Sequence, residues 1–343
     1  MASPLWPASD APSLLVEVMN TMKAAVIRRA GGPEVLQVEE RPIPVPQKGE
    51  VLIRVKAFGL NRSELFTRQG LSPTVKFPRV LGIEAVGLVV QAPGNGFREG
   101  DVVATAMGGM GRQFDGGYAE YTCVPATQVQ ALKTSLPWET LGAIPEMLQT
   151  SWGSLFKSLR LEEGERLLIR GGTTSVGLAA AGIARLHGAC VAATTRRPER
   201  EMLLRGSGVD QVFIDNGAIA GQVKEVFPRG VDKVLELIGS TTLQDSLRCT
   251  KQRGIVCMTG MVGNKWTVDD FSPMEVIPTA VCLTTYDGGA EDFMLTPLDD
   301  LIEKIGAGQL RIQTGPVFRL DQIAEAHRCM EENKAGGKIV VLT

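Results

Sequence analysis

Residues 167–181, LLIRGGTTSVGLAAA, combine residue types that can hold a phosphate group. The apolar run that opens the segment is typical of a buried parallel strand, and small or apolar residues at helical spacing follow the turn. Gly171 and Gly172 allow a sharp turn close to a ligand, and Gly177 allows the next helix to pack against the strand. The helix N-terminus would present free N–H groups to a pyrophosphate. Thr174 occupies the middle position of the G-x-G-x-x-G motif, so an ordinary strand–helix loop is the alternative to a dinucleotide site.

A second apolar run, at 189–193, is followed by two threonines and two arginines. In dinucleotide-binding folds an acidic residue about 20 positions beyond the turn binds the ribose 2′-hydroxyl of NAD, whereas an arginine accommodates the 2′-phosphate of NADP. Arg196 and Arg197 stand at this strand end, which carries no Asp or Glu, and a guanidinium fork suits a phosphate dianion. A solvated surface pair is the alternative, but the position favours NADPH as the cofactor.

The composition is that of a globular chain: of 343 residues, 44% are hydrophobic and 22% are charged. This length suffices for two domains with a substantial core. A net charge of −2 gives no attraction to nucleic acid or to an anionic membrane, and no apolar stretch is long enough to span a bilayer. We therefore expect a small-molecule partner, with neither nucleic acid nor membrane.

The cysteines and the first residues bear on the compartment. None of the six cysteines is spaced C-x-x-C, and several stand in apolar runs, which predicts reduced thiols in a cytoplasmic protein. Residues 1–21 contain no Lys or Arg and no long apolar core, so they match neither a signal peptide nor a transit peptide. We expect them to form a flexible extension before a strand that begins at Met22.

The elements that would position these residues change character along the chain. Residues 22–140 carry frequent Pro and Gly turns, and 50–58 alternates apolar and polar residues, which predicts short strands closed into a small barrel or sandwich. Beyond Leu141, helical stretches alternate with apolar strands, as in a doubly wound parallel sheet, so the expected fold class is α/β. The expected strands of that sheet lie at 167–170, 189–195, 211–214, 232–238 and 254–259. The last 48 residues should add helices at 298–306 and 320–333, a segment around Val317, and a strand at 338–342.

The order of these parts resembles the medium-chain dehydrogenase/reductase superfamily. The resemblance covers nearly the whole chain from Met22, and its closest subgroup is the zinc-independent quinone oxidoreductases and enone reductases. It implies a GroES-like domain built from residues 22–140 and 296–343, with a Rossmann domain, 141–295, inserted between them. The segments that carry it are MKAAVIRRAGGPEVLQVEERPIP from Met22, GIEAVG from Gly82, GDVV from Gly100, GGYAEY from Gly116, GGTTSVG from Gly171 and GKIV from Gly337.

The resemblance also indicates where a catalytic zinc would be held. Such an ion needs three ligands from Cys, His or a carboxylate. Asn61 and Ile83 stand where the zinc enzymes of the superfamily have a Cys and a His, and Glu146 stands at the third position. Only one ligand-capable side chain remains, so we expect no metal. The two histidines, His187 and His327, are expected to have surface or helix-capping roles.

Without zinc as a Lewis acid, an activated alkene is easier to reduce than a simple ketone. A hydride delivered from nicotinamide C4 to the β-carbon of an enone leaves an enolate, which a few hydrogen-bond donors can stabilise. The resemblance therefore implies NADPH-dependent reduction of a quinone or an α,β-unsaturated carbonyl compound, with Asn61 as the catalytic residue at the cleft floor. It also implies cofactor contacts at Thr150, Gly172, Thr173, Thr174, Ser175, Val176, Arg196, Arg197, Leu237, Gly239, Thr259, Gly260, Met261 and Lys338.

Three other functions are weighed against this one. Enoyl-thioester reductases of the superfamily use a Tyr proton donor where this chain has Ser72, a poorer acid. A non-catalytic NADPH-binding protein is the second alternative, because a fold does not fix a function. A zinc alcohol dehydrogenase is the third, and the missing ligands argue against it. Finally, 281–285 is typical of an edge strand, and pairing of two such edges predicts a homodimer.

Overall fold

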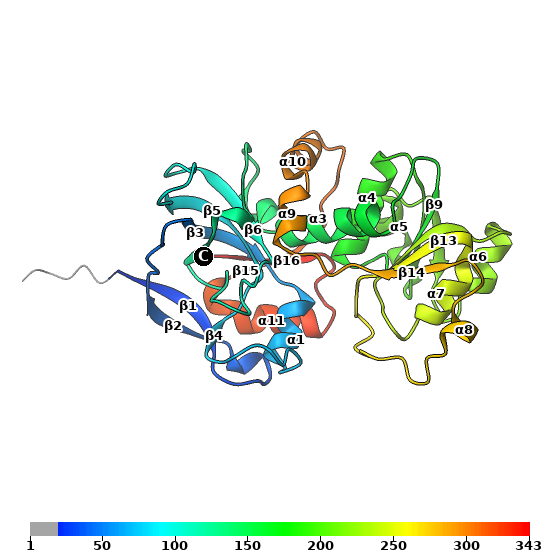
Figure 1. The fold of residues 1–343 in the computed structure, drawn as a ribbon, viewed down its shortest axis with the longest axis horizontal. Helices are drawn as coiled ribbons and strands as arrows, with labels where there is room; N and C mark the ends of the chain where they lie inside the picture. Colours follow the sequence, from blue (N-terminus) through cyan, green and yellow to red (C-terminus); the bar gives the residue numbers. More distant parts are fainter. Residues whose placement is uncertain (1–19) are drawn as a thin grey trace, which may run out of the picture.

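The computed structural model describes residues 20–343, and residues 1–19 of the expected extension lie outside the described residues. The strands form three sheets, two at the blue and cyan end of Figure 1 and one at the green and yellow end. Strand β1 begins at Thr21, one residue before the expected start at Met22.

The first two sheets combine strands from both parts of the chain that flank the parallel sheet. A three-stranded sheet has the order β2-β1-β4, and a seven-stranded sheet has the order β15-β16-β3-β5-β6-β8, with β7 paired to β3. The return strand β16 pairs antiparallel with β3, so residues about 280 positions apart share one sheet. The bounds are β1 (Thr21–Ile27), β2 (Gln37–Pro42), β3 (Glu50–Gly59), β4 (Arg79–Val80), β5 (Glu84–Gln91), β6 (Val102–Ala106), β7 (Tyr121–Pro125), β8 (Val129–Ala131), β15 (Thr314–Arg319) and β16 (Lys338–Leu342).

The third sheet is wholly parallel and has the order β11-β10-β9-β12-β13-β14. Numbered within the sheet, this is the 3-2-1-4-5-6 order of a doubly wound dinucleotide-binding fold, whose switch point lies between the first and fourth strands. Its strands are β9 (Arg166–Arg170), β10 (Cys190–Thr195), β11 (Gln211–Ile214), β12 (Val231–Glu236), β13 (Thr250–Met258) and β14 (Cys282–Thr285). The α/β fold class is confirmed, with a GroES-like part and a Rossmann-like parallel sheet.

Helices connect and cover these sheets. In Figure 1, α3 and α9 lie between the two ends of the molecule, and α1 and α11 lie beside the first two sheets. Over residues 20–343, no helix is both long and apolar enough to cross a membrane. The helices are α1 (Arg62–Arg68), α2 (Trp138–Leu141), α3 (Pro145–Trp152), α4 (Ser175–Leu186), α5 (Glu201–Arg205), α6 (Ala220–Val226), α7 (Leu243–Cys249), α8 (Pro273–Val276), α9 (Ala290–Leu295), α10 (Leu298–Gly306) and α11 (Ile323–Glu331). Short turns of other helical types are η1 (Pro33–Val35), η2 (Ala126–Gln128), η3 (Gly153–Ser158, a π-helix), η4 (Pro198–Arg200) and η5 (Leu320–Gln322).

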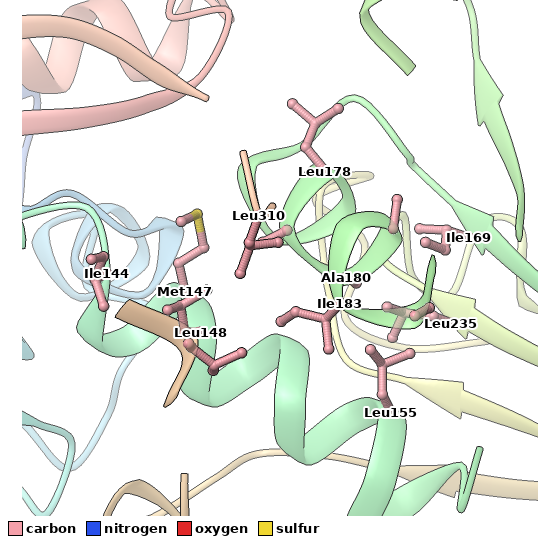
Figure 2. Packing of buried hydrophobic residues seen from close by; sticks show 14 of the residues in the cluster. Ile144, Met147, Leu148, Leu155, Ile169, Leu178, Ala180, Ile183, Leu235 and Leu310 are labelled. Carbon is pink, nitrogen blue, oxygen red and sulfur yellow. The ribbon is translucent and has the colours of Figure 1, made fainter. Parts of the chain in front are cut away.

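One continuous apolar core joins the parallel sheet to the GroES-like part. Figure 2 shows Met147 and Leu148 of α3 on one side of this core, and Ile183 of α4 with Ile169 and Leu235 on the other. The same core reaches buried residues of β5 and β6. Because α3 buries one face against each part, it fixes the cleft between them.

The two histidines differ from one another. His187 is exposed at the C-terminus of α4, as expected. The surface role expected for His327 is wrong, because its side chain is fully buried and its Nε2 lies 3.0 Å from the Tyr118 hydroxyl. Burial lowers the pKa of His327 to about 3, so the ring is neutral. The physical reason is helical spacing: Ile323 lies four residues earlier, on the stripe of α11 that faces the core.

Candidate functional site

A cavity of about 1000 Å³ runs between the GroES-like part and the carboxyl ends of the parallel strands. Its lining comes from α1, α3, the glycine turn, the ends of β10, β12 and β13, and the loop that leads into β16. This volume is at the upper end of the range for ligand sites, and the position is the switch point at which such sheets bind ligands. The cavity therefore has room for a dinucleotide and a second, small molecule.

The glycine turn is built to leave the start of α4 open. Thr174 is the N-cap residue: its Oγ1 accepts from Gly177 N at 3.0 Å and donates to the Gly171 carbonyl at 2.9 Å. A Cβ on Gly177 would lie 2.8 Å from the Gly171 oxygen, so this position needs glycine. Thr174 thus replaces the motif's middle glycine as a helix cap, and the first N–H groups of α4 face the cavity without intrahelical partners. These are the groups that a pyrophosphate requires.

The end of β10 supplies positive charge. Arg196, Arg197 and Arg200 line the cavity, and within residues 20–343 none of them forms an ion pair. The nearby acid Asp215 also lines the cavity, but both of its carboxylate oxygens accept from Arg170, at 2.8 and 2.9 Å. Arg170 lowers the pKa of Asp215 against the opposing effect of burial. This end of the cavity therefore attracts anions.

At the other end, Asn61 lies in a buried network of charged side chains. Its Nδ2 donates to Glu84 Oε1 at 2.9 Å and to Glu64 Oε1 at 3.3 Å, and its Oδ1 accepts from Lys338 Nζ. Lys338 Nζ also lies 2.9 Å from Glu84 Oε1 and 3.4 Å from Glu146 Oε2. An ammonium can only donate and a carboxylate can only accept, so these partners fix the orientation of the Asn61 amide.

The charges of this network are set by burial and by each other. Burial disfavours the charged form of Lys338, but Glu84 and Glu146 outweigh it, and the pKa of Lys338 is raised. Burial raises the pKa of Glu64 to about 7, and the negative charge of Glu84 adds to this. Glu64 Oε2 has no hydrogen-bond partner among residues 20–343. Lys338 is therefore a permanent cation, whereas Glu64 titrates near neutrality.

Two rings meet beside the cavity. Phe66 of α1 and Trp266 of the loop after β13 contact edge to face, with ring centroids 4.9 Å apart. Both line the cavity, although Trp266 keeps 51% of its surface exposed. This contact joins the GroES-like part to the parallel-sheet part across the cleft.

The structure brings most of the sequence-predicted site residues to this one cavity. Gly172 and Gly239 do not line it. A Cβ on Gly172 would lie 2.7 Å from that of Ala193, and one on Gly239 would lie 2.9 Å from the Gly260 oxygen, so both glycines allow close packing behind the cavity wall. The predicted residues that line it are Asn61, Thr150, Thr173, Thr174, Ser175, Val176, Arg196, Arg197, Leu237, Thr259, Gly260, Met261 and Lys338.

Sequence reasoning missed several lining residues. Ser63 and Arg112 contact each other in the cavity wall, and Trp266 comes from a loop whose shape the sequence does not give. Ser63 could have been found from its position two residues after Asn61. Across residues 20–343, no group of three or more His, Cys, Asp or Glu side chains is arranged to hold a metal ion.

We predict that Glu64 makes stability depend on pH. Its pKa of about 7 in the folded protein exceeds the 4.5 of a free carboxyl, so the folded state binds this proton more tightly than the unfolded chain. The stability that Glu64 contributes is therefore complete below about pH 4.5 and is lost as the pH rises through 7. Glu64→Gln should gain on the order of 2–3 kcal/mol of unfolding free energy relative to wild type between pH 5 and pH 8. Denaturant titrations at both pH values measure this.

Glu99→Gln, at an exposed carboxyl, is the matched control and should show no such trend. Parallel pH profiles for wild type and Glu64→Gln would contradict the prediction.

Two family models match the chain. The alcohol dehydrogenase GroES-like domain covers residues 47–134, and the zinc-binding dehydrogenase domain covers residues 207–341. Their order along the chain agrees with the arrangement of the two kinds of sheet.

Relatives and solved structures agree with these models over nearly the whole chain. A quinone oxidoreductase of Sus scrofa is 29% identical, with 94% of this chain and 98% of the relative covered. A mycobacterial structure in complex with NADPH is 26% identical, with a TM-score of 0.84 and coverage of 94% and 100%. The NADPH complex of Escherichia coli quinone oxidoreductase shares the fold at 22% identity, with a TM-score of 0.84 and the same coverage. The chain belongs to the medium-chain dehydrogenase/reductase superfamily, and quinone oxidoreductases are among its relatives.

Proposed function

We propose that this protein is an NADPH-dependent, zinc-independent oxidoreductase that transfers a hydride to a quinone or to an α,β-unsaturated carbonyl compound. The observation that carries the proposal is one cavity with two different ends. At one end lie an open helix N-terminus and arginines that form no ion pair within the described chain, and the buried Asn61–Lys338–Glu84 network lies at the other. The quinone oxidoreductase relatives and the NADPH complexes among similar structures support the same reaction class.

Each part of the cofactor has residues that suit it. Thr173, Ser175 and Val176 at the start of α4 would hold the pyrophosphate, and Arg196 and Arg197 the 2′-phosphate. When bound, NADPH supplies a hydride from nicotinamide C4. The residues that would flank its ribose and nicotinamide are Thr150, Leu237, Thr259, Gly260, Met261 and Lys338.

We assign Asn61 a positioning role. Both of its amide hydrogens are donated to glutamates and its oxygen accepts from Lys338, so its amide holds the network rather than the substrate. Leu60, Ile83 and Met107 line the same cavity and give it an apolar wall. The substrate would be oriented against this wall, and orientation is the main requirement for hydride transfer between two bound molecules.

We also propose the two-domain division of the chain, with 22–140 and 296–343 in one domain and 141–295 in the other. Strands β15 and β16 share a sheet with β3, whereas β9 to β14 form a sheet of their own. The six cysteines form no disulfide, which supports a cytoplasmic protein.

We predict that NADPH binds much more tightly than NADH. Arg196 and Arg197 line the cavity without an ion-pair partner within residues 20–343, so the 2′-phosphate would supply the missing negative charge. Arg196→Ala and Arg197→Ala should each cost on the order of 1.5–3 kcal/mol of NADPH binding and leave NADH binding unchanged. Calorimetric or fluorescence titration gives these constants. Arg229→Ala, at an exposed arginine outside the cavity, is the control. Equal affinity of wild type for NADPH and NADH would contradict the assignment of Arg196 and Arg197 to the 2′-phosphate.

We predict that wild type reduces cyclohexenone or a naphthoquinone with NADPH, and that cyclohexanone is a poor substrate. Hydride addition to a conjugated system leaves a delocalised anion, whereas a saturated ketone gives a localised alkoxide, and the side chains of residues 20–343 offer no ligand set for a metal that would stabilise it. Because Asn61 positions the network and does not contact the substrate, Asn61→Ala should lower turnover by less than the about 2.7–4 kcal/mol of a lost oxyanion donor, but by more than it weakens NADPH binding. Steady-state kinetics and a separate NADPH titration measure the two effects.

Equal turnover of the enone and the saturated ketone would reject the reaction class. An unchanged rate in Asn61→Ala would reject only the role of that residue. Elemental analysis of the same preparation should give far less than one zinc per chain.

We propose a homodimer in which β14 of one copy pairs with β14 of another. Within the described chain, β14 is the last strand of its sheet and pairs only with β13, and Cys282 at its start is exposed. An unpaired edge is a template for pairing with a second copy. Sedimentation at micromolar concentration should show a dimer. Cys282→Lys should shift the protein to monomer, since a charged edge opposes pairing, whereas Cys282→Ser should stay dimeric; a monomeric wild type would disprove the arrangement.

A further inference from the structure

The polar groups around Asn61 differ in whether they have a hydrogen left to donate. A carbonyl oxygen that gains negative charge during hydride transfer needs such a donor. The donors of Asn61 are both taken by glutamates. Lys338 has three hydrogens and three partners: Asn61 Oδ1, Glu84 Oε1 and Glu146 Oε2. The ammonium of Lys338 therefore has no hydrogen left to donate to a substrate.

Two hydroxyls of the cavity wall, those of Thr150 and Ser72, are also occupied by hydrogen bonds within the protein. Thr150 Oγ1 donates to Glu146 Oε1 at 2.8 Å. Thr67 Oγ1 donates to the Ser63 carbonyl at 3.0 Å and lies 2.8 Å from Ser72 Oγ. Because Thr67 has only one hydroxyl hydrogen, Ser72 is the donor in that pair. The Ser72 hydroxyl is therefore not available to a substrate.

Ser63 and Arg112 are in the opposite situation. Ser63 Oγ accepts a hydrogen bond from Arg112 Nη2. The hydroxyl hydrogen of Ser63 itself donates to no acceptor within residues 20–343. Arg112 forms no ion pair in the described chain and keeps further N–H groups free. Both residues line the cavity, Ser63 from the first turn of α1 and Arg112 from the loop after β6. Arg62 is the other cation of this region, but its Nη2 donates at 2.7 Å to Asn333 Oδ1 in the loop before β16.

We infer that the Ser63 hydroxyl and the Arg112 guanidinium together bind the carbonyl oxygen of the substrate and stabilise the oxyanion that hydride transfer produces. This inference rests on the proposed function. In the step, the hydride of NADPH brings two electrons to the β-carbon, and the electrons of the C=C bond move to leave a negative charge on the carbonyl oxygen. NADP⁺ remains, and a proton from water completes the α-carbon. Arg112 polarises the Ser63 hydroxyl, so the pair donates more strongly than a lone serine.

The first test uses binding alone. Para-nitrophenol resembles an enolate, and its phenolate absorbs at a longer wavelength than its phenol. We expect wild type saturated with NADP⁺ to bind the phenolate form and to lower the apparent pKa of the bound phenol. Ser63→Ala and Arg112→Gln should each weaken phenolate binding roughly tenfold to hundredfold. Arg229→Gln, which removes the same charge from an exposed site outside the cavity, should bind like wild type.

The second test uses turnover of cyclohexenone. Loss of a donor to a developing oxyanion lowers kcat more than it raises KM, on the order of 10²-fold for Ser63→Ala. Ser63→Thr keeps the hydroxyl and should recover most of the rate. If Ser63 had only a structural role, the rate would not depend on whether residue 63 carries a hydroxyl. NADPH affinity should be unchanged in each variant.

The outcomes separate this inference from the proposed function. Normal kcat and normal phenolate binding in Ser63→Ala and Arg112→Gln, with wild type active on the enone, would overturn the donor pair and leave the reaction class intact. If wild type consumes no NADPH with any quinone or enone, the proposed function fails. Phenolate binding then still tests whether Ser63 and Arg112 form an oxyanion site. Loss of phenolate binding in both Ser63→Ala and Arg112→Gln supports such a site, and unchanged binding in both variants refutes it.

Discussion

The candidate site depends on the burial of one ammonium group, Lys338 Nζ. Its side chain is 2% exposed, and such a charge is tolerated in the interior only when partners compensate it. The partners come from different parts of the chain: Asn61 is the N-cap of α1, Glu84 begins β5 and Glu146 lies in the first turn of α3. One cation therefore holds together the return strand and three elements that are distant in sequence. Gly59 makes room for it, since a Cβ there would clash with Lys338 Cε and lie 2.5 Å from Glu84 Oε1.

The other end of the cavity relies on backbone rather than on buried charge. There the Thr174 cap and Gly177 fix the start of α4, and Arg170 pairs with Asp215, so that this carboxylate does not compete for the arginines at the end of β10. The two ends are linked because α3 packs on α4 (Figure 2). Glu146, which belongs to the lysine network, lies in the first turn of α3. A single helix thus couples the geometry of the glycine turn to that of the lysine network.

Features with a local cause were predictable from the sequence, and features that arise from long-range packing were not. The parallel strands follow from short apolar runs between helices, and the expected bounds of α10 and β16 agree with the structure because each segment has a clear amphipathic or apolar pattern. The glycine turn was found because its signal lies in one short segment. By contrast, the hydrogen bond from Lys338 to Asn61 joins residues 277 positions apart, and nothing in either segment indicates the other. The polarity of its ring favours a surface position for His327, whereas its i, i+4 relation to Ile323 places it on the buried stripe of α11.

The ammonium of Lys338 differs from a catalytic zinc in what it can offer a substrate. A catalytic zinc keeps an open coordination position and polarises an oxygen directly. Lys338 has no such position, because its three hydrogens are taken by Asn61, Glu84 and Glu146. Its positive charge is also offset by two carboxylates, so it exerts little net pull on a carbonyl. In the proposed reaction, such a site would stabilise a delocalised anion through the donors that remain free, and the reactivity of the substrate itself would supply the rest.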